Sequence, residues 1–267
     1  MKTIIAGTDF SSSSVNACKY ACFLAQKLKC KLVLFNMFEA PILHSNVGLY
    51  GYSYASVKKN SEDKIEKLIK NLLKLFPDLV IETFVTIGGF KEELENFISS
   101  HHIEAAVMGL ETKNKISKFI YGSHGIKIAG KINTPVIIVP QSYKKFHLSK
   151  LLLAVDNNEK LNQTSLKRLE TFITVSKSRL NILHVRTEDE IFKPKINSIT
   201  INDKQKKIEI IEALDIQDGI KKYCRIKKPD LIVLISKKHS AFYNFFNESA
   251  TKKIAFVSKV PIMAIHQ

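Results

Sequence analysis

Residues Glu104 to Pro140, EAAVMGLETKNKISKFIYGSHGIKIAGKINTPVIIVP, carry the clearest evidence of the fold class. Their pattern predicts a buried strand over Ala105–Met108, an exit at Gly109, a lysine-rich loop, a helix, and a second apolar strand over Val136–Val139. Two strands joined through a helix form a parallel pair with a right-handed crossover. We therefore expect an α/β fold with a mostly parallel sheet.

Two turns in this stretch are candidate ligand sites. Gly109 carries no Cβ, so the backbone can approach a ligand closely there. Gly122-Ser123 precedes a predicted helix, whose first N–H groups and positive dipole end favour an anion such as phosphate. The plainer interpretation is that Gly122-Ser123 only begins a helix.

Composition indicates a globular protein. The chain has 267 residues, enough for two domains, with 45% apolar and 25% charged residues. The net charge of +16 could attract nucleic acid or an anionic membrane. The lysines are interleaved with glutamates and arginine is scarce, so we expect a solvated basic surface and no specific nucleic-acid partner.

The chain carries no apolar run near the roughly 18 residues that cross a bilayer. Its start, MKTIIAGTDF, is typical of a core strand and not of a signal peptide. We therefore expect a cytoplasmic protein with no membrane partner.

The four cysteines predict neither a disulfide framework nor a metal site. Cys18 and Cys22 are four apart on a predicted helix, but no histidine or further cysteine is spaced to complete a zinc site around them. Cys30 and Cys224 stand apart from this pair. We expect reduced thiols in the core.

The first 40 residues read as a β-α-β unit. A strand over Lys2–Gly7 ends at Thr8-Asp9, and the serine run Ser11–Ser14 offers caps for the next helix. A second strand covers Lys31–Met37. After an irregular connection over Phe38–Asn60, whose role stays open, we expect a helix over Lys59–Phe76, a strand over Leu79–Ile87 and a helix over Lys91–Ser100.

The pattern then restarts after a polar, basic linker over Gln141–Ser149, which indicates an internal duplication. The second copy is shorter, and Ile191–Ile201 reads as irregular. We predict two tandem domains, 1–142 and 148–267, each with a mostly parallel five-stranded sheet flanked by helices. The expected elements of the second copy are strands at Lys150–Asp156, Arg179–Val185, Lys206–Ala213, Asp230–Ile235 and Val260–Ile265, and helices at Thr164–Ser178, Asp218–Lys228 and Ser249–Lys259.

These features together resemble a tandem universal stress protein with a degenerate second domain. The resemblance covers nearly the whole chain. Its five markers are Asp9 with its serine run, the strand Lys31–Met37, Gly109–Ser123, Thr134–Val139, and His239–Phe256 in the second half. It implies an adenine nucleotide alpha hydrolase-like, Rossmann-like fold. It also implies a cytoplasmic stress-response module, with homodimers expected.

The family's nucleotide motif is a glycine, two residues, a glycine, nine residues, then Gly-Ser/Thr. This chain has Gly109, then Thr112 in place of the second glycine, then Gly122 and Ser123 at the matching distance. Thr112 adds a Cβ and disfavours positive φ where a phosphate would approach. Nearby lysines could compensate by charge; these are Lys113, Lys115 and Lys118.

The resemblance implies a site for ATP with Mg²⁺ in the first domain. Asp9 would contact the nucleoside, and Met37 and Met108 would line the base pocket. The ribose and phosphates would be held by Gly109, Thr112, Gly122, Ser123 and His124. Each also has a plain interpretation, with Asp9 as a helix cap, Met108 as core and His124 as a solvated residue.

The second copy departs further from the motif. Asp156 and Ser249 are kept, but Ile235, Lys238 and Glu248 stand where the three glycines belong. Bulk and negative charge there would repel phosphate, so we predict no nucleotide in this half. Its role would be to pair with the first half through the strand edges at Val136–Val139 and Pro261–Ile265.

The leading functional hypothesis is a stress-response binding module that holds ATP. No catalytic set is evident, since there is no Ser-His-Asp order and no P-loop lysine, so at most slow ATP hydrolysis is expected. One alternative is a ligand-free scaffold, which the Thr112 departure favours. The other is a nucleotide-dependent ligase or transferase, for which Ser11–Ser14 is only a faint echo of a pyrophosphate loop because it lacks glycine.

Overall fold

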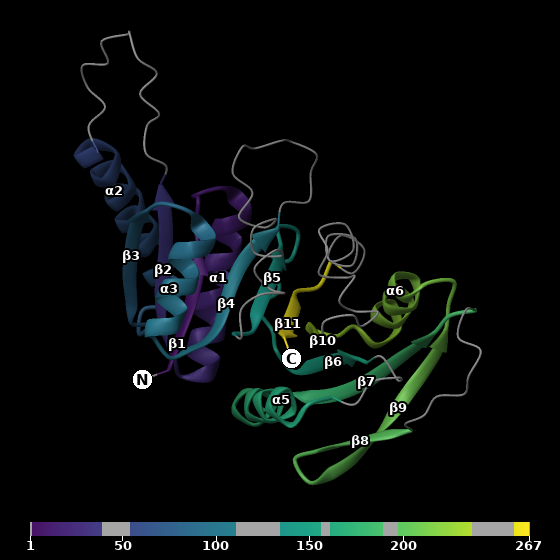
Figure 1. Ribbon diagram of the computed structural model, residues 1–267. Helices are drawn as coiled ribbons and strands as arrows, with labels where there is room; N and C mark the ends of the chain where they lie inside the picture. The colour runs from purple at the N-terminus through teal and green to yellow at the C-terminus, as the bar shows by residue number, and fades with distance from the viewer. Residues whose placement is uncertain are drawn as a thin grey trace.

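The computed structural model describes residues 2–38, 54–110, 134–155, 161–188, 197–236 and 259–266. These residues form an α/β fold with one 11-stranded sheet and helices on both of its faces (Figure 1). We call residues 2–140 the first half and residues 150–266 the second half. No helix in the described part of the chain is long and apolar enough to cross a membrane.

The first half begins with a strand-helix-strand unit, as expected. Its helix α2 starts at Tyr54, so the predicted irregular connection extends no further than residue 53. The helix predicted after Gly122 lies outside the described residues. The elements of this half are β1 Thr3–Gly7, α1 Ser12–Leu28, β2 Lys31–Phe38, α2 Tyr54–Leu73, β3 Ile81–Ile87, α3 Phe90–Ser100, β4 Ile103–Leu110 and β5 Val136–Pro140.

The second half repeats the alternation of strands and helices. Its predicted helix at Ser249–Lys259 lies outside the described residues except for its last one. The elements are β6 Lys150–Ala154, α5 Gln163–Ser176, β7 Arg179–Arg186, β8 Ser198–Ile201, β9 Lys204–Glu212, α6 Ile216–Lys227, β10 Leu231–Ser236 and β11 Ile262–His266.

The sheet has the strand order β3-β2-β1-β4-β5-β11-β10-β6-β7-β9-β8. Read outward from its middle, the first half runs β5-β4-β1-β2-β3 and the second runs β11-β10-β6-β7-β9, so the two halves share one order. Neighbouring strands are parallel except at β5–β11 and β8–β9. The predicted α/β class with a mostly parallel sheet is confirmed.

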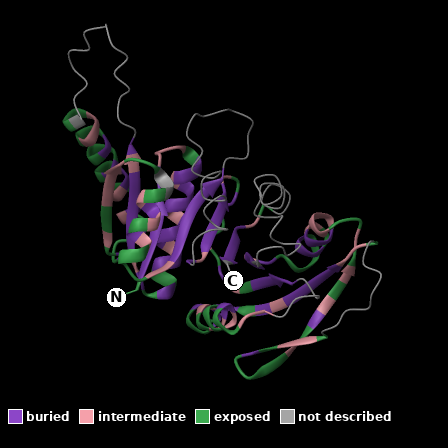
Figure 2. Cartoon of the chain, viewed as in Figure 1, coloured by how far each residue is buried: buried purple, intermediate pink, exposed green. Residues whose placement is uncertain are grey.

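Burial explains why the central strands read as continuous apolar runs. All five residues of β1, TIIAG, are buried, because helices cover both faces of the sheet there. The edge strand β3 mixes exposed and half-buried residues instead. Figure 2 shows this gradient from a buried centre to exposed margins at α2, β8 and β9.

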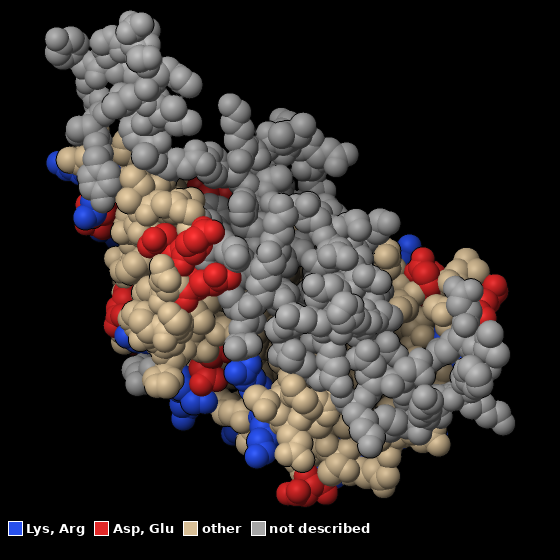
Figure 3. Space-filling model, viewed as in Figure 1, with Lys and Arg blue, Asp and Glu red and all other residues tan. Residues whose placement is uncertain are grey.

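The charge is spread over the surface. On the face shown in Figure 3, Lys and Arg side chains lie among Asp and Glu, and the described residues form no continuous basic band there.

The two halves meet along a seam where β11 and β5 pair antiparallel, with Ile262 opposite Ile138 and Ala264 opposite Val136. These are the two edges that the sequence analysis named. Because the pair is antiparallel, the carboxyl ends of the parallel strands point to one side of the sheet in the first half and to the opposite side in the second.

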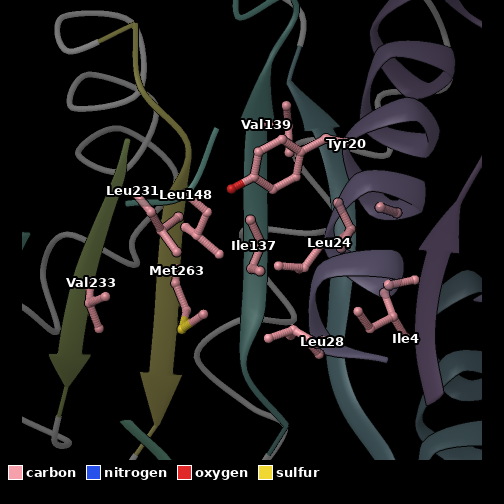
Figure 4. Packing of buried hydrophobic residues seen from close by; sticks show 14 of the residues in the cluster. Ile4, Tyr20, Leu24, Leu28, Ile137, Val139, Leu148, Leu231, Val233 and Met263 are labelled. Atoms are coloured by element: carbon pink, nitrogen blue, oxygen red, sulfur yellow. The ribbon is translucent and has the colours of Figure 1, made fainter. Parts of the chain in front are cut away.

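The core is continuous across the seam. On the face covered by α1, α2 and α5, one apolar cluster includes residues of both halves. Figure 4 shows Tyr20 and Leu24 of α1 beside Ile137 of β5, with Leu148 and Met263 next to them. A second cluster fills the face covered by α3 and α6.

The segment Gln141–Ser149, expected to be a polar linker, is packed into this seam. Tyr143 and Leu148 are only 8% and 3% exposed. The Asn16 side-chain amide donates to the carbonyls of Pro140 at 3.2 Å and Tyr143 at 2.9 Å. The segment reads as polar because it is rich in lysine. In the structure these lysines are exposed, whereas the apolar side chains of the segment turn inward.

Asp230 fastens the end of this segment. Its Oδ2 accepts hydrogen bonds from the backbone amides of Ser149 and Lys150, both at 2.8 Å. Burial opposes ionisation of Asp230, but these bonds and those from the side chains of His147 and Ser149 outweigh it and hold the pKa below its usual range. The end of the linker is thus fixed to the second half, whereas Asn16 fixes its start to the first half.

One prediction for the second half was wrong. The last four residues of the stretch expected to be irregular, Ser198–Ile201, form β8, which pairs antiparallel with β9. The connection is the two-residue turn Asn202-Asp203, with φ of 49° and 56°, as a tight hairpin of this kind requires. Ile201 is 1% exposed and anchors the hairpin in the core.

Candidate functional site

The candidate site lies at the carboxyl ends of β1 and β4, where the strand order reverses and ligands bind in open α/β sheets. The structure brings four of the predicted residues to this edge: Asp9 after β1, Met37 near the end of β2, and Met108 and Gly109 near the end of β4. The other four lie outside the described residues; they are Thr112, Gly122, Ser123 and His124.

The turn after β1 is held by short-range hydrogen bonds. Asp9 Oδ1 accepts from the Ser11 amide at 2.9 Å, and Ser11 Oγ accepts from the Ser14 amide at 3.2 Å. Ser11 is therefore the cap of α1, and Asp9 shapes the turn that leads to it. Between them, Phe10 adopts a positive φ of 63°, which is uncommon for a bulky residue.

Asp9 is half-buried and keeps one oxygen available. Its Oδ1 is engaged with Ser11, whereas its Oδ2 has no hydrogen-bond partner among the described residues. A carboxylate oxygen in this position can accept a hydrogen bond from a ligand hydroxyl or amine.

Asn36 also lies at this edge, although no motif in the sequence marks it. It is 3% exposed, and its Nδ2 donates to the Thr8 carbonyl at 2.7 Å. Its Oδ1 is buried and has no partner in the part of the chain that the structure describes. An unsatisfied buried acceptor costs free energy, so this atom is a natural partner for a ligand donor. The available signal was a lone asparagine inside the apolar run KLVLFNM.

The two methionines differ in access. Met108 is fully buried in the cluster on the α3 face, which makes it a core residue. Met37 is half-buried and packs against the margin of the same cluster. Of the two, Met37 is the one whose side chain can border a ligand.

Gly109 serves the packing of α1. A Cβ built on it would lie 2.8 Å from the Ser14 backbone nitrogen and closer still to the carbonyl group of Ser13. The space left by the absent side chain is therefore occupied by the first turn of α1. Gly109 lets α1 begin close to β4, which places the positive end of the helix dipole at the candidate site.

Positive potential at this edge comes from the start of α1 and from a lysine. The first turn of α1 carries no acidic residue. Lys64 Nζ lies 5.7 Å from the centre of the Phe10 ring, so a cation stands beside the turn. Phosphate groups suit a helix start of this kind.

The described residues offer no cluster of three His, Cys, Asp or Glu side chains that could hold a metal ion. All four cysteines are buried free thiols. Burial raises the pKa of Cys18 to about 12 and that of Cys30 to about 11, so neither is a reactive thiolate at neutral pH.

The corresponding edge of the second half is filled differently. Ile235, which stands where Gly109 does, is 5% exposed and lies in the apolar cluster on the α5 face. The other positions of the motif in this half lie outside the described residues; they are the kept Asp156 and Ser249 and the departures Lys238 and Glu248.

Comparisons with known proteins give a family and a fold. A profile of the Universal stress protein family matches residues 1–140, more than half of the 267-residue chain. No curated protein matches the chain. The structure is similar to that of a universal stress protein from Archaeoglobus fulgidus DSM 4304, with a TM-score of 0.69, 15% identity, and coverage of 99% of this chain and 98% of that one.

Two further solved structures are similar. A functionally unknown protein from Pseudomonas aeruginosa PAO1 has a TM-score of 0.57, 8% identity, and coverage of 99% of this chain and 92% of that one. A universal stress protein in complex with cAMP covers 52% of this chain and 96% of its own, at 21% identity and a TM-score of 0.39. The profile match over residues 1–140 decides the assignment: the chain belongs to the universal stress protein family.

Proposed function

We propose that this chain is a cytoplasmic stress-response regulator whose first domain, residues 1–142, binds ATP with Mg²⁺ at the carboxyl ends of β1 and β4. The observation that carries the proposal is the buried Asn36 Oδ1, which lacks a described partner beside the half-available carboxylate of Asp9. Membership of the universal stress protein family supports the same assignment.

Each group has a role suited to its chemistry. Asp9 Oδ2 accepts a hydrogen bond from a ribose hydroxyl, and Asn36 Oδ1 accepts one from a nucleoside N–H or O–H group. Met37 borders the base. The first turn of α1 and the Gly122-Ser123 turn receive the phosphates, whose charge the Mg²⁺ ion partly neutralises.

The second domain, residues 148–267, binds no nucleotide and takes the place of a second subunit. The β11–β5 pairing and the shared core support this role. The output of the module is a change of partner or conformation. A homodimer of the whole chain remains part of the proposal.

A ligand-free scaffold is the second candidate. One observation favours it: the backbone of α1 occupies the space beside Gly109 that a ligand would otherwise use. The same experiment separates the two candidates.

The test titrates Mg-ATP into the full chain by calorimetry and identifies nucleotides released from purified protein by mass spectrometry. The parent is expected to bind saturably. Gly122→Glu, which copies the second half, is expected to abolish binding by charge repulsion. Lys207→Glu on β9, an exposed position in the second half, is the control and is expected to bind like the parent.

Two variants of Asp9 separate its charge from its structural bond. Asp9→Asn keeps an acceptor for the Ser11 amide and is expected to fold normally but bind about tenfold more weakly, or about 1.4 kcal/mol. Asp9→Ala loses both the negative charge and the acceptor for the Ser11 amide. Absence of saturable binding and of co-purified nucleotide contradicts the ATP proposal and leaves the scaffold, while equal binding by Gly122→Glu places the site elsewhere.

A further inference from the structure

A cavity of about 380 Å³ lies on the seam, at the end of the first half opposite to Asp9. Its walls come from the amino ends of β1, β4 and β5, from α5, and from β11. It exists because β5 and β11 are antiparallel, which brings the amino edge of the first half beside the carboxyl edge of the second. Its volume falls in the range of small-molecule sites.

Part of the wall is apolar. Met263 and Ile265 of β11 are each 1% exposed and belong to the continuous core, while Phe172 of α5 packs against that core and is partly buried. Ile103 and Pro135 extend the same surface into the first half. A ligand seated here would bury an apolar body against residues of both halves.

The rest of the wall is polar and mainly cationic. Its charged residues are Lys2, Lys167 and Arg168 against one carboxylate, Glu104. Lys2 Nζ pairs with Glu104 Oε1 at 2.9 Å, so these two charges largely balance. Lys167 is exposed on α5 and has no acidic partner among the described residues, which leaves a cation facing the cavity.

We propose that this cavity binds a small organic monoanion, an apolar body that ends in a carboxylate. The apolar wall takes the body, and Lys167, with Arg168 beside it, takes the carboxylate. A polyphosphate fits less well, because part of the wall is apolar and Glu104 adds a carboxylate to it. The proposal is independent of ATP binding, since the two sites lie at opposite ends of the first half's strands.

Such a ligand would act on the junction of the two halves. It contacts β1, β4 and β5 on one side and α5 and β11 on the other, so it binds only the docked arrangement. A ligand that binds the folded chain but not the unfolded chain raises the free energy of unfolding by mass action. The cavity would thereby couple the level of an organic acid to the stability of the seam.

The test uses the full chain and three eight-carbon probes: octanoate, octanol and octylamine. Octanoate is expected to bind saturably in calorimetry and to raise the midpoint of thermal unfolding. Octanol is expected to bind at least tenfold more weakly, and octylamine not at all. Octanoate binding is also expected to weaken at high salt, because charged residues of the wall such as Lys2 and Glu104 are partly exposed to solvent.

Two variants locate the site. Lys167→Glu is expected to lower octanoate affinity at least tenfold, whereas Lys67→Glu on α2 makes the same charge change away from the cavity and is expected to have no effect. Thr171→Trp fills the cavity from an exposed position of α5 and is expected to abolish binding while circular dichroism remains that of the parent.

Three results would overturn the proposal: no saturable octanoate binding, equal binding of octanoate and octanol, or equal affinity in Lys167→Glu and Lys67→Glu. Asp9→Ala provides the separation from the nucleotide site. It is expected to leave octanoate affinity unchanged, so failure of either proposal can be recognised without the other.

Discussion

The packing of α1 requires a glycine at position 109, since the backbone of Ser13 and Ser14 lies where a Cβ would be. Gly109→Ala must therefore push α1 away from β4, and we expect a loss of about 2 kcal/mol in the free energy of unfolding, as for an overpacked core. Urea denaturation followed by circular dichroism measures this loss.

Gly89→Ala is the control for Gly109→Ala. A Cβ on Gly89 meets only the mobile end of the Glu92 side chain, so we expect a loss of about 1 kcal/mol or less. If Gly109→Ala keeps full stability but loses ATP binding, the space beside Gly109 is needed for the ligand and not for the packing of α1.

The buried thiols predict that the folding stability falls at alkaline pH. The folded state raises the pKa of Cys18 to about 12, so the neutral thiol is favoured there. The stability from this effect is fully present below the pKa of the unfolded thiol. It is lost as the pH rises toward 12, because the unfolded chain releases its proton first.

Cys18→Ala tests this linkage. We expect the variant to be less stable than the parent at pH 7, because it leaves a cavity, but to lose about 2 kcal/mol less than the parent between pH 7 and pH 10.5. Urea titrations at both pH values give the comparison. Equal losses would show that the Cys18 thiol does not contribute.

At the scale of elements, the β8–β9 hairpin depends on its two-residue turn. Asp203 has a φ of 56°, a conformation that β-branched residues strongly disfavour. We expect Asp203→Val to cost about 1–2 kcal/mol. Asp203→Gly creates an Asn-Gly turn and is expected to stay within about 0.5 kcal/mol of the parent.

Both hairpin variants are compared by urea denaturation, with hydrogen exchange at β8 as the local measurement. The hairpin also docks on α5, where the Asn202 amide donates to Glu170 Oε1 at 2.8 Å. Equal stability of the Val and Gly variants would mean that the turn conformation does not hold β8 in place.

At the scale of the whole molecule, the shared core predicts that the halves unfold together. Met263 is 1% exposed in the second half and lies in the same cluster as Ile4 and Ile137 of the first. We expect Met263→Ala to cost about 3 kcal/mol. Amide exchange is expected to speed up in β1 as well as in β7.

An exposed truncation controls for Met263→Ala. Leu214 is 80% exposed, so Leu214→Ala is expected to change neither stability nor exchange appreciably. If Met263→Ala accelerates exchange in β7 but leaves β1 unchanged, the halves are independent units and the seam is only a contact between them.

Local patterns in the sequence were sufficient for the order and type of most elements. The β-branched run ending at Gly7, the serine cap at Ser11 and the apolar spacing of α1 all act between near neighbours in the chain, so they are readable without a structure. The repeat of this pattern after residue 149 likewise indicated a duplication, and the structure adds that the two copies share one strand order.

Other features arise only from contacts between distant residues. Asn36 lacks a partner because of where β1 ends, Tyr143 is buried because α1 lies over it, and the cavity beside Lys167 opens because β11 runs against β5. No local pattern encodes these distances. The sequence by itself determined which segments form strands and helices, since that choice depends on periodicity and caps. Which edges meet, and in which direction, followed from contacts in the folded chain, because the antiparallel pair joins residues more than a hundred positions apart.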